Sequence, residues 1–400
     1  MEYKQTNTFF ALKEMSKVKI IDKSNIKNIK NERNLLSKLN HPFIVNMHFS
    51  FQNNNFLYLV IDLLTGGDLR YHSFYKKFFS EVQTKFFISC VILGLEYCHS
   101  NLIIHHDIKP ENLILDSHGY AHIADFGIAK MQQPNNAKET SGTLGYMAPE
   151  VLFEKDHTTV ADYFSLGAVC YEFMNGEKPY TGKTRKEMKV KIREKEIKLD
   201  KNNIKEGWSL EAADFINQLL KRQPQKRLGY TGGITELKKH AWLKDINWKD
   251  LYNGLLKAPY IPFGEENFEH SFCNAEEVKK EDTEKRYQEI MKSIDYKNMF
   301  DDYYYFNRYD AKTQGLKMLY FNIHEKIYKV KQMPRLNTGR ITVNKKYQNM
   351  KIPIKPGLKR GMSPMGAMPN KAFTEANKFI IKRKNRSKQK LDIPKLKLHD

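Results

Sequence analysis

The amino-acid sequence predicts an α+β fold, with strands near the N-terminus and helices after them. Residues 56–61 are β-branched and aromatic and run into the turn signal Thr65-Gly66-Gly67, which is typical of a buried strand. Residues 81–99 and 161–174 repeat large apolar side chains at helical spacing.

A short hairpin is predicted between these two helices. Residues 113–115 and 122–124 are apolar and flank the turn signal Ser117-His118-Gly119. The hairpin would place residues 107–112 on a loop and Asp125 just after a strand.

That loop and strand end carry a dense set of chemical groups. Residues 104–112 read I-H-H-D-I-K-P-E-N, and residues 125–127 read D-F-G. Phosphoryl transfer needs a carboxylate that takes the proton of the accepting hydroxyl, a cation near the moving phosphate, and oxygen ligands for magnesium. In that order, the groups present are Asp107, Lys109, and the pair Asn112 and Asp125.

Other motifs occur in a fixed order around this stretch, which chance matches of single motifs do not explain. F-A-L-K at 10–13 and Glu32 precede it, and A-P-E follows at 148–150. With these motifs, residues 5 to about 270 resemble a eukaryotic Ser/Thr protein kinase of the AGC group, which includes the cyclic-AMP-dependent kinase. The group is indicated by N-H-P-F-I-V at 40–45, G-G-D-L at 66–69, I-N-W at 246–248 and A-P-Y-I-P at 258–262.

The resemblance implies a bilobal protein kinase fold that uses ATP and Mg²⁺. Residues 1–64 would form a truncated, β-rich N-lobe and residues 65–243 a mainly helical C-lobe. Residues 244–310 would form an AGC-type C-terminal tail, and residues 311–400 a basic, mostly disordered tail.

The resemblance also implies roles in nucleotide binding. Lys13, on a strand, would hold the α- and β-phosphates, and Glu32, on a helix, would pair with it. Asp62 and Leu64 would meet adenine through their backbone, with Ile61 as the gatekeeper.

Four further residues have structural roles in the family. Thr143 resembles the threonine that bonds the catalytic Asp and Lys, which favours Ser or Thr over Tyr as the acceptor. Glu150 and Arg227 look like the family's structural ion pair, and Asp162 like the residue that braces the catalytic loop.

The glycine-rich loop is the first departure from the family's pattern. That loop lies about twenty residues before the strand lysine, whereas twelve residues precede Lys13. Either the sequence starts late or the protein lacks the loop. As written, we expect the chain to hold ATP in a more open cleft.

The second departure concerns the activation loop. His106 stands where the family has an Arg that grips a loop phosphate, and imidazole cannot imitate that planar fork. The usual phosphosite falls on Glu139, next to Thr140 and Ser141. We therefore expect weakened control by phosphorylation of this loop.

The third departure is the aromatic segment 300–305, F-D-D-Y-Y-Y, which only faintly resembles the family's F-x-x-F-S/T-F motif. It has no Ser or Thr at the phosphorylated position. A simpler interpretation is an aromatic patch that packs on the small lobe without a regulatory role.

Positive charge is concentrated at the C-terminal end. Residues 311–400 contain 23 Lys and Arg against four Asp and Glu, which leaves +2 of the net +21 for residues 1–310. The sharpest run is K-R-K-N-R-S-K-Q-K at 382–390. It would suit nucleic acid, an anionic membrane surface or an import receptor, or be a solvated tail without a partner.

The remaining composition favours a soluble, cytoplasmic protein, with nuclear or peripheral membrane locations left open by the tail. The cysteines at 90, 98, 170 and 273 have no metal-ligand spacing, which indicates a reduced compartment. The N-terminus lacks the apolar region of a signal peptide, and the apolar stretch 86–95 is too short to cross a bilayer.

The function predicted from the sequence is transfer of the ATP γ-phosphate to Ser or Thr hydroxyls of proteins. Asp68 and Glu111 match acidic positions in relatives that select basic residues upstream of the acceptor. Two alternatives stay open: a pseudokinase scaffold, and a polyanion-binding module that works through the basic tail.

Overall fold

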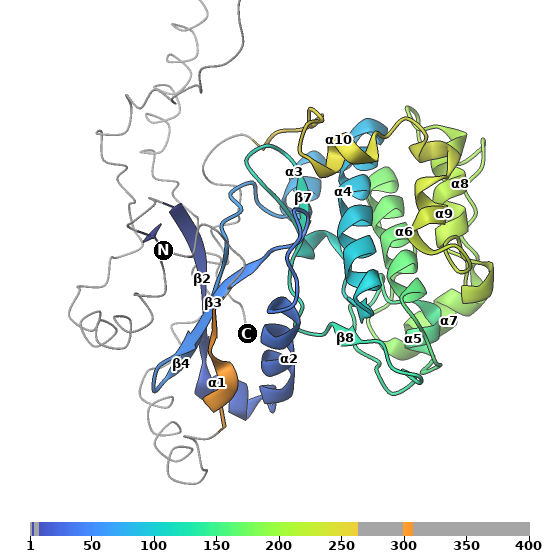
Figure 1. Ribbon diagram of the computed structural model, residues 1–400. Coiled ribbons are helices and arrows are strands. Elements are labelled where there is room, and N and C mark those ends of the chain that lie inside the picture. Colours follow the sequence, from blue (N-terminus) through green and yellow to red (C-terminus); the bar gives the residue numbers. More distant parts are fainter. Residues whose placement is uncertain (1, 4–7, 263–298, 307–400) are drawn as a thin grey trace, which may run out of the picture. The chain divides into compact units, whose positions relative to one another are not determined.

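The computed structural model describes residues 2–3, 8–262 and 299–306, and the contacts of the chain place all of them in one unit, residues 1–333 (Figure 1). The basic tail expected at 311–400 lies outside the described residues. No helix within the described ranges is both long and apolar enough to span a membrane.

The described elements begin with a strand-rich part that contains two helices and continue with a mainly helical part. They are β1 (Glu2–Tyr3), β2 (Thr8–Ser16), α1 (Lys17–Asp22), α2 (Ile26–Leu36), β3 (Met47–Gln52), β4 (Phe56–Asp62), α3 (Leu69–Lys76), α4 (Glu81–Ser100), β5 (Ile103–Ile104), η1 (Pro110–Asn112), β6 (Leu113–Leu115), β7 (Ala121–Ile123), β8 (Lys130–Met131), α5 (Pro149–Leu152), α6 (Val160–Asn175), α7 (Arg185–Glu194), α8 (Leu210–Leu219), η2 (Pro224–Lys226), α9 (Gly233–Lys238), η3 (Ala241–Leu243), α10 (Trp248–Tyr252), η5 (Asp301–Tyr303) and β9 (Tyr305–Phe306).

The small lobe is an antiparallel sheet with strand order β1-β2-β4-β3-β9. Residues Phe10 to Ser16 of β2 pair with the whole of β4, so that Lys13 stands opposite Leu59. The buried side chains of β4, Leu57, Leu59 and Val60, confirm the strand predicted for 56–61 and anchor β2 beside it. The sheet therefore fixes the position of Lys13.

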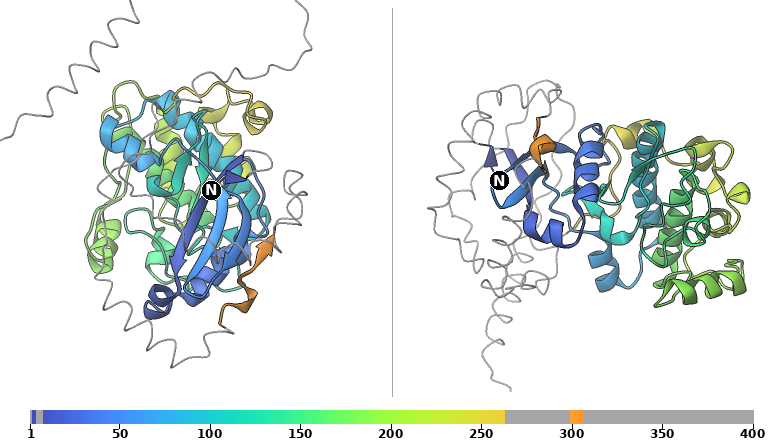
Figure 2. Two further views of the ribbon diagram at one scale, coloured as in Figure 1. Left: turned by 90° about the vertical axis from the view of Figure 1, so that its left-hand side faces the viewer. Right: turned by 90° about the horizontal axis from the view of Figure 1, so that it is seen from below.

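Strand β9 brings residues from far along the chain to the outer edge of β3. Phe49 pairs with Phe306 and Ser50 with Tyr305, and both side views show this orange segment against the sheet (Figure 2). Phe300 and Tyr303 are buried. The 300–305 segment thus packs on the small lobe, as the simpler interpretation expected.

The large lobe is built around α4 and α6, which agree with the helices predicted at 81–99 and 161–174. Helix α4 starts at a capping box in which Ser80 and Gln83 each bond the other's backbone N–H. Helix α6 ends at Gly176, whose φ of +77° gives the left-handed cap that glycine adopts without strain. Helix α4 packs against β7 in the hairpin of β6 and β7, residues 113–115 and 121–123.

Candidate phosphoryl-transfer site

Asp162 on α6 holds the backbone of the catalytic loop. Its two carboxylate oxygens each accept a backbone N–H, from His105 and His106, at 2.9 Å. Burial alone would raise the pKa of Asp162, but the hydrogen bond with His99 and the surrounding imidazoles lower it to about 2. The carboxylate is therefore charged, and the bracing role inferred for Asp162 agrees with this geometry.

Asp107 lies at the centre of the predicted catalytic group. Lys109 Nζ lies 2.6 Å from Asp107 Oδ2, and the Thr143 hydroxyl donates to Oδ1 at 2.6 Å. Lys109 also donates to Thr143 at 2.9 Å. Burial raises the pKa of Asp107, but the bonds from Lys109 and Thr143 outweigh it and leave the pKa below its usual value. Asp107 is thus an ionised base.

Lys13 and Glu32 meet across the small lobe, 2.7 Å apart, as predicted. Glu32 on α2 is buried, whereas the Lys13 side chain is 40% exposed. Burial raises the pKa of Glu32, and Lys13 opposes that rise. Next to Glu32, Asn31 donates to the carbonyl of Ala129 at 2.6 Å, which ties α2 to the segment after D-F-G.

Of the two predicted magnesium ligands, Asn112 contacts the catalytic carboxylate directly, whereas Asp125 bonds within its own turn. The Asn112 amide nitrogen donates to the backbone oxygen and Oδ2 of Asp107, at 2.9 and 3.0 Å. This leaves its amide oxygen as the group that can face a cation. Asp125 is exposed, has a φ of +59°, and accepts the Gly127 N–H at 3.1 Å.

This donor set fits Mg²⁺ bound together with phosphate, because magnesium keeps several waters and takes few protein ligands. Among the described residues, no group of three or more His, Cys, Asp or Glu could hold a metal by itself. Phe126 of the D-F-G motif is buried, and its ring contacts that of His105 edge-on, with 4.9 Å between the ring centroids. The D-F-G turn is thereby fixed beside the catalytic loop.

Asp62 ends β4 where the connection to the large lobe begins. Its side chain is engaged by Asn46 and His48 at 2.8 Å each, so only its backbone is available for adenine. Among the described residues no hydrogen bond uses the backbone N–H of Leu64, two residues on.

The activation segment has partners that the sequence did not indicate. Glu139 pairs with Lys130, three residues after Gly127, at 3.8 Å. His106 is buried, has a φ of +66°, and contacts His157. Weakened control by phosphorylation of this segment stays a prediction.

The ion pair of Glu150 and Arg227 is formed by two parallel contacts of 2.6 and 2.9 Å. The side chains are 4% and 0% exposed. Arg227 also donates to the carbonyl of Val160 at 2.9 Å, which links the A-P-E motif to the start of α6. The architectural role inferred for this pair agrees with its burial.

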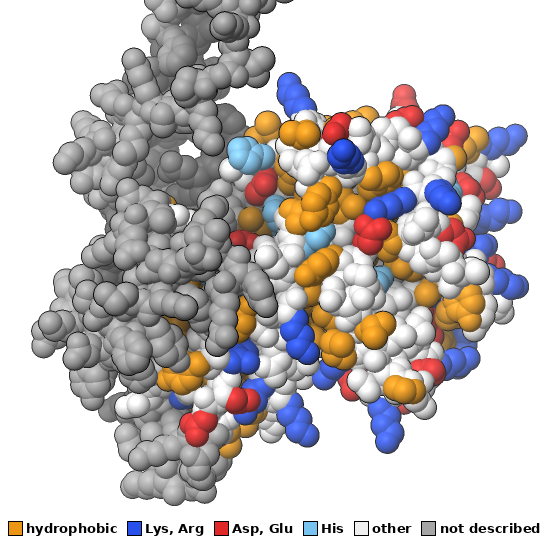
Figure 3. Space-filling view, in the orientation of Figure 1, with side chains coloured by type: hydrophobic (Ala, Val, Ile, Leu, Met, Phe, Trp, Pro, Cys, Tyr) orange, Lys and Arg blue, Asp and Glu red, His pale blue; other side chains and the backbone are white. Residues whose placement is uncertain are grey.

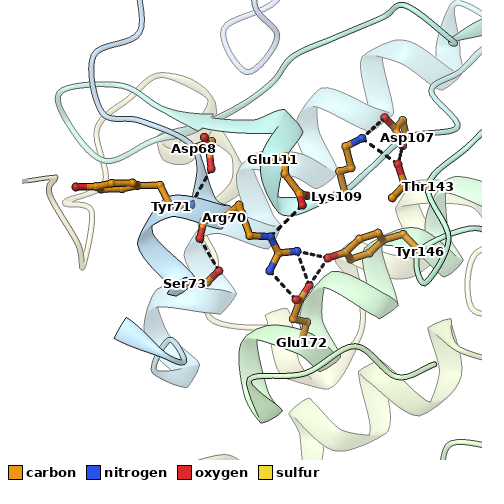
Figure 4. A network of polar contacts seen from close by, with 10 residues as sticks. All are labelled: Asp68, Arg70, Tyr71, Ser73, Asp107, Lys109, Glu111, Thr143, Tyr146 and Glu172. Atoms are coloured by element: carbon orange, nitrogen blue, oxygen red, sulfur yellow. Dashed lines mark hydrogen bonds and ion pairs between the residues drawn. The ribbon is translucent and has the colours of Figure 1, made fainter. Parts of the chain in front are cut away.

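No sequence pattern indicated the charged cluster that Arg70 forms in the large lobe. Arg70 on α3 contacts Glu111, Glu172 and Tyr146 at once (Figure 4). Its partners lie 41 to 102 residues away in sequence, so no local spacing could reveal it. Asp68, which matches an acidic position in relatives that select basic residues, caps α3 by accepting the Tyr71 N–H at 2.8 Å.

The fold and this set of residues are those of the protein kinase class. Residues 2–243 match the protein kinase domain family, and the chain belongs to that family. The expected resemblance to AGC-group Ser/Thr kinases is confirmed by the relatives.

Curated relatives match over about 250 to 280 residues. A probable serine/threonine-protein kinase of Dictyostelium discoideum is 39% identical over 68% of this chain and 59% of its own length. The kinase sgk-1 of Caenorhabditis elegans is 38% identical over 66% of this chain and 56% of its own. Human ribosomal protein S6 kinase alpha-2 is 36% identical over 63% of this chain and 34% of its own. The matched part thus spans less than two thirds of these relatives.

Proposed function

We propose that this chain is a protein serine/threonine kinase that transfers the γ-phosphate of Mg-ATP to Ser or Thr hydroxyls of protein substrates. The observation that carries the proposal is the geometry of Asp107, which is ionised and held by Lys109, Thr143 and Asn112. The Lys13–Glu32 pair of the small lobe supports it. The names of the relatives support the choice of Ser and Thr.

Each residue has a defined task in this reaction. Mg-ATP supplies the phosphoryl group and an electrophilic phosphorus. Asp107 Oδ1 or Oδ2 accepts the proton of the substrate hydroxyl, and Lys109 offsets negative charge next to that carboxylate. Lys13 would hold the α- and β-phosphates, and Asn112 and Asp125 would hold magnesium. Asp62 and Leu64 would bind adenine through their backbone.

The test is magnesium-dependent phosphate transfer by Asp107→Asn. The amide cannot accept the hydroxyl proton as a carboxylate does, so the rate should fall by about 10²–10⁴-fold, while Mg-ATP binding by calorimetry is retained. Asp245→Asn, at an exposed aspartate of the large lobe, is the matched control. Equal rates in the two variants would contradict the proposal and favour a scaffold without catalysis.

We also propose that the basic tail binds a polyanion, a nucleic acid or an anionic membrane surface. The support is charge alone, because six Lys and Arg fall within residues 382–390. On the face of the described residues in Figure 3, by contrast, Lys and Arg are interspersed with Asp and Glu. Changing these six to Gln in the full chain should weaken binding and flatten its salt dependence. Unchanged binding would contradict this role.

Selection of basic residues upstream of the acceptor was inferred from Asp68 and Glu111. Both carboxylates already have partners within the chain, the Tyr71 N–H and Arg70. We therefore propose only a weak preference for basic residues upstream of the acceptor.

A further inference from the structure

Arg70 has almost all of its donors engaged within the chain. Nε lies 3.0 Å from Glu111 Oε1, and Nη1 lies 2.7 Å from Glu172 Oε1. Nη2 lies 3.2 Å from Glu172 Oε2 and also donates to the Tyr146 hydroxyl. One guanidinium therefore bridges two carboxylates that come from different parts of the large lobe (Figure 4).

Arg70 and Tyr146 occupy most of the acceptor capacity of Glu172. Both of its oxygens accept from Arg70, and Oε2 also accepts the Tyr146 hydroxyl at 2.5 Å. Its side chain is 7% exposed. Glu111 and Arg70 are 41% and 31% exposed, so the cluster can be reached from solvent on their side.

The cluster shares its backbone with the groups that hold Asp107. Glu111 directly precedes Asn112, whose amide donates to Asp107. Tyr146 donates its backbone N–H to the carbonyl of Thr143, whose hydroxyl bonds Asp107. The residues that flank the hydroxyl of a bound peptide come within reach of these segments, because each residue covers roughly 3.5 Å.

Two carboxylates converging beside such a path form a site for a guanidinium or ammonium group, since a planar fork can bond both. We propose that Arg70 is a specificity-determining residue: it fills this acidic site from within the chain, so that the protein substrate does not need Arg or Lys next to its phosphoacceptor. This inference rests on the proposed kinase function and names the substrate class of that same site.

The test compares peptides that carry one Ser acceptor and have Arg or Ala at each flanking position in turn. For the unchanged protein, the ratio of kcat/KM for Arg over Ala should stay below about threefold at every position. In Arg70→Ala the ratio should rise above about tenfold at one position, through a lower KM, because one charge-assisted contact to the freed carboxylates is worth about that factor. The double variant Arg70→Ala with Glu111→Gln should lose the gain.

The control is Lys77→Gln, which removes an exposed positive charge at the end of the same helix and should leave the ratio unchanged. Arg70→Gln serves as a second variant, with the same expected direction, should Arg70→Ala not fold. An Arg over Ala ratio that stays below threefold in both variants overturns the proposal, as does failure of both to fold, which would make Arg70 structural. Absence of transfer by the unchanged protein would instead contradict the kinase function itself.

Discussion

The Nε2 atoms of His106 and His157 lie 3.0 Å apart, and both rings are buried. His157 Nδ1 lies 3.1 Å from the carbonyl oxygen of Lys155, so a neutral His157 carries its proton there. His157 Nε2 then accepts from His106 Nε2. The other nitrogen of His106, Nδ1, is buried and has no hydrogen-bond partner among the described residues. This arrangement fits two neutral rings and leaves no acceptor for an added proton.

The first prediction is that the free energy of unfolding falls as the pH drops from about 6.5 to 4. Burial first, and then His157 and His105, lower the pKa of His106 from 6.5 to about 4. The unfolded chain takes up this proton at a higher pH than the folded one, so the stability is complete above 6.5 and is lost toward 4. The shift corresponds to about 3 kcal/mol. Urea unfolding at several pH values measures it.

His106→Asn is the variant for this prediction, because asparagine tolerates the positive φ of 66° at this position. It should unfold with a smaller pH dependence than the unchanged protein. His118→Asn, at an exposed histidine, is the control and should keep the full dependence. Burial also lowers the pKa of His41 to about 4, and His41 contributes the same pH dependence of unfolding to all three proteins. The same pH slope in all of them would exclude His106 as the cause.

The second prediction is that Glu32→Gln lowers activity without lowering stability. Lys13 loses its ionic partner, so kcat/KM for ATP should fall on the order of 10²-fold through misplacement of the phosphate contact. Burial of the Glu32 carboxylate is unfavourable, as its raised pKa indicates, and the neutral amide removes that cost. Thermal unfolding should therefore be unchanged or later. Glu14→Gln, exposed on β2, serves as the control.

The third prediction is that Thr140→Ala combined with Ser141→Ala keeps most of the transfer rate. Arg185 donates to the backbone oxygen of Thr140, which alanine retains. Glu139 already places a carboxylate near Lys130. Steady-state kinetics before and after phosphatase treatment measure the effect. A fall to background in the double variant would identify one hydroxyl as an obligatory switch.

The fourth prediction separates a buried ion pair from an exposed one. Glu150→Gln leaves the charge of Arg227 buried without a counter-charge and should cost about 3–5 kcal/mol of unfolding free energy. Glu196→Gln removes contacts to Lys221 and Arg222 on a side chain that is 53% exposed, and should cost at most about 1 kcal/mol. Similar losses in chemical denaturation would contradict the architectural role of Arg227.

The sequence predicted the parts of the site that recur as motifs. The contacts of Lys13 with Glu32, of Asp107 with Lys109 and Thr143, and the bracing by Asp162 all agree with positions read from short patterns. These patterns are informative because each residue sits at a fixed distance from a turn or strand end that holds it.

The contacts of Arg70, His157 and Lys130 could not be predicted in the same way. Each depends on segments brought together by tertiary packing, and each residue alone is an ordinary charged or polar side chain in sequence. The cap role of Asp68 had a readable signal, since Asp is favoured at the residue before a helix. It was overlooked because the same residue also matched an acidic position of the family.

Because β9 pairs with β3, the sheet edge at Ser50 is complete only after Tyr305 and Phe306 have been synthesised. During synthesis residues 65–243 leave the ribosome before that edge can close, since chains grow at about 5–20 residues per second. The half-finished sheet then exposes unpaired backbone groups for roughly ten seconds or longer. Folding of the small lobe is thus expected to finish last, although its strands are made first.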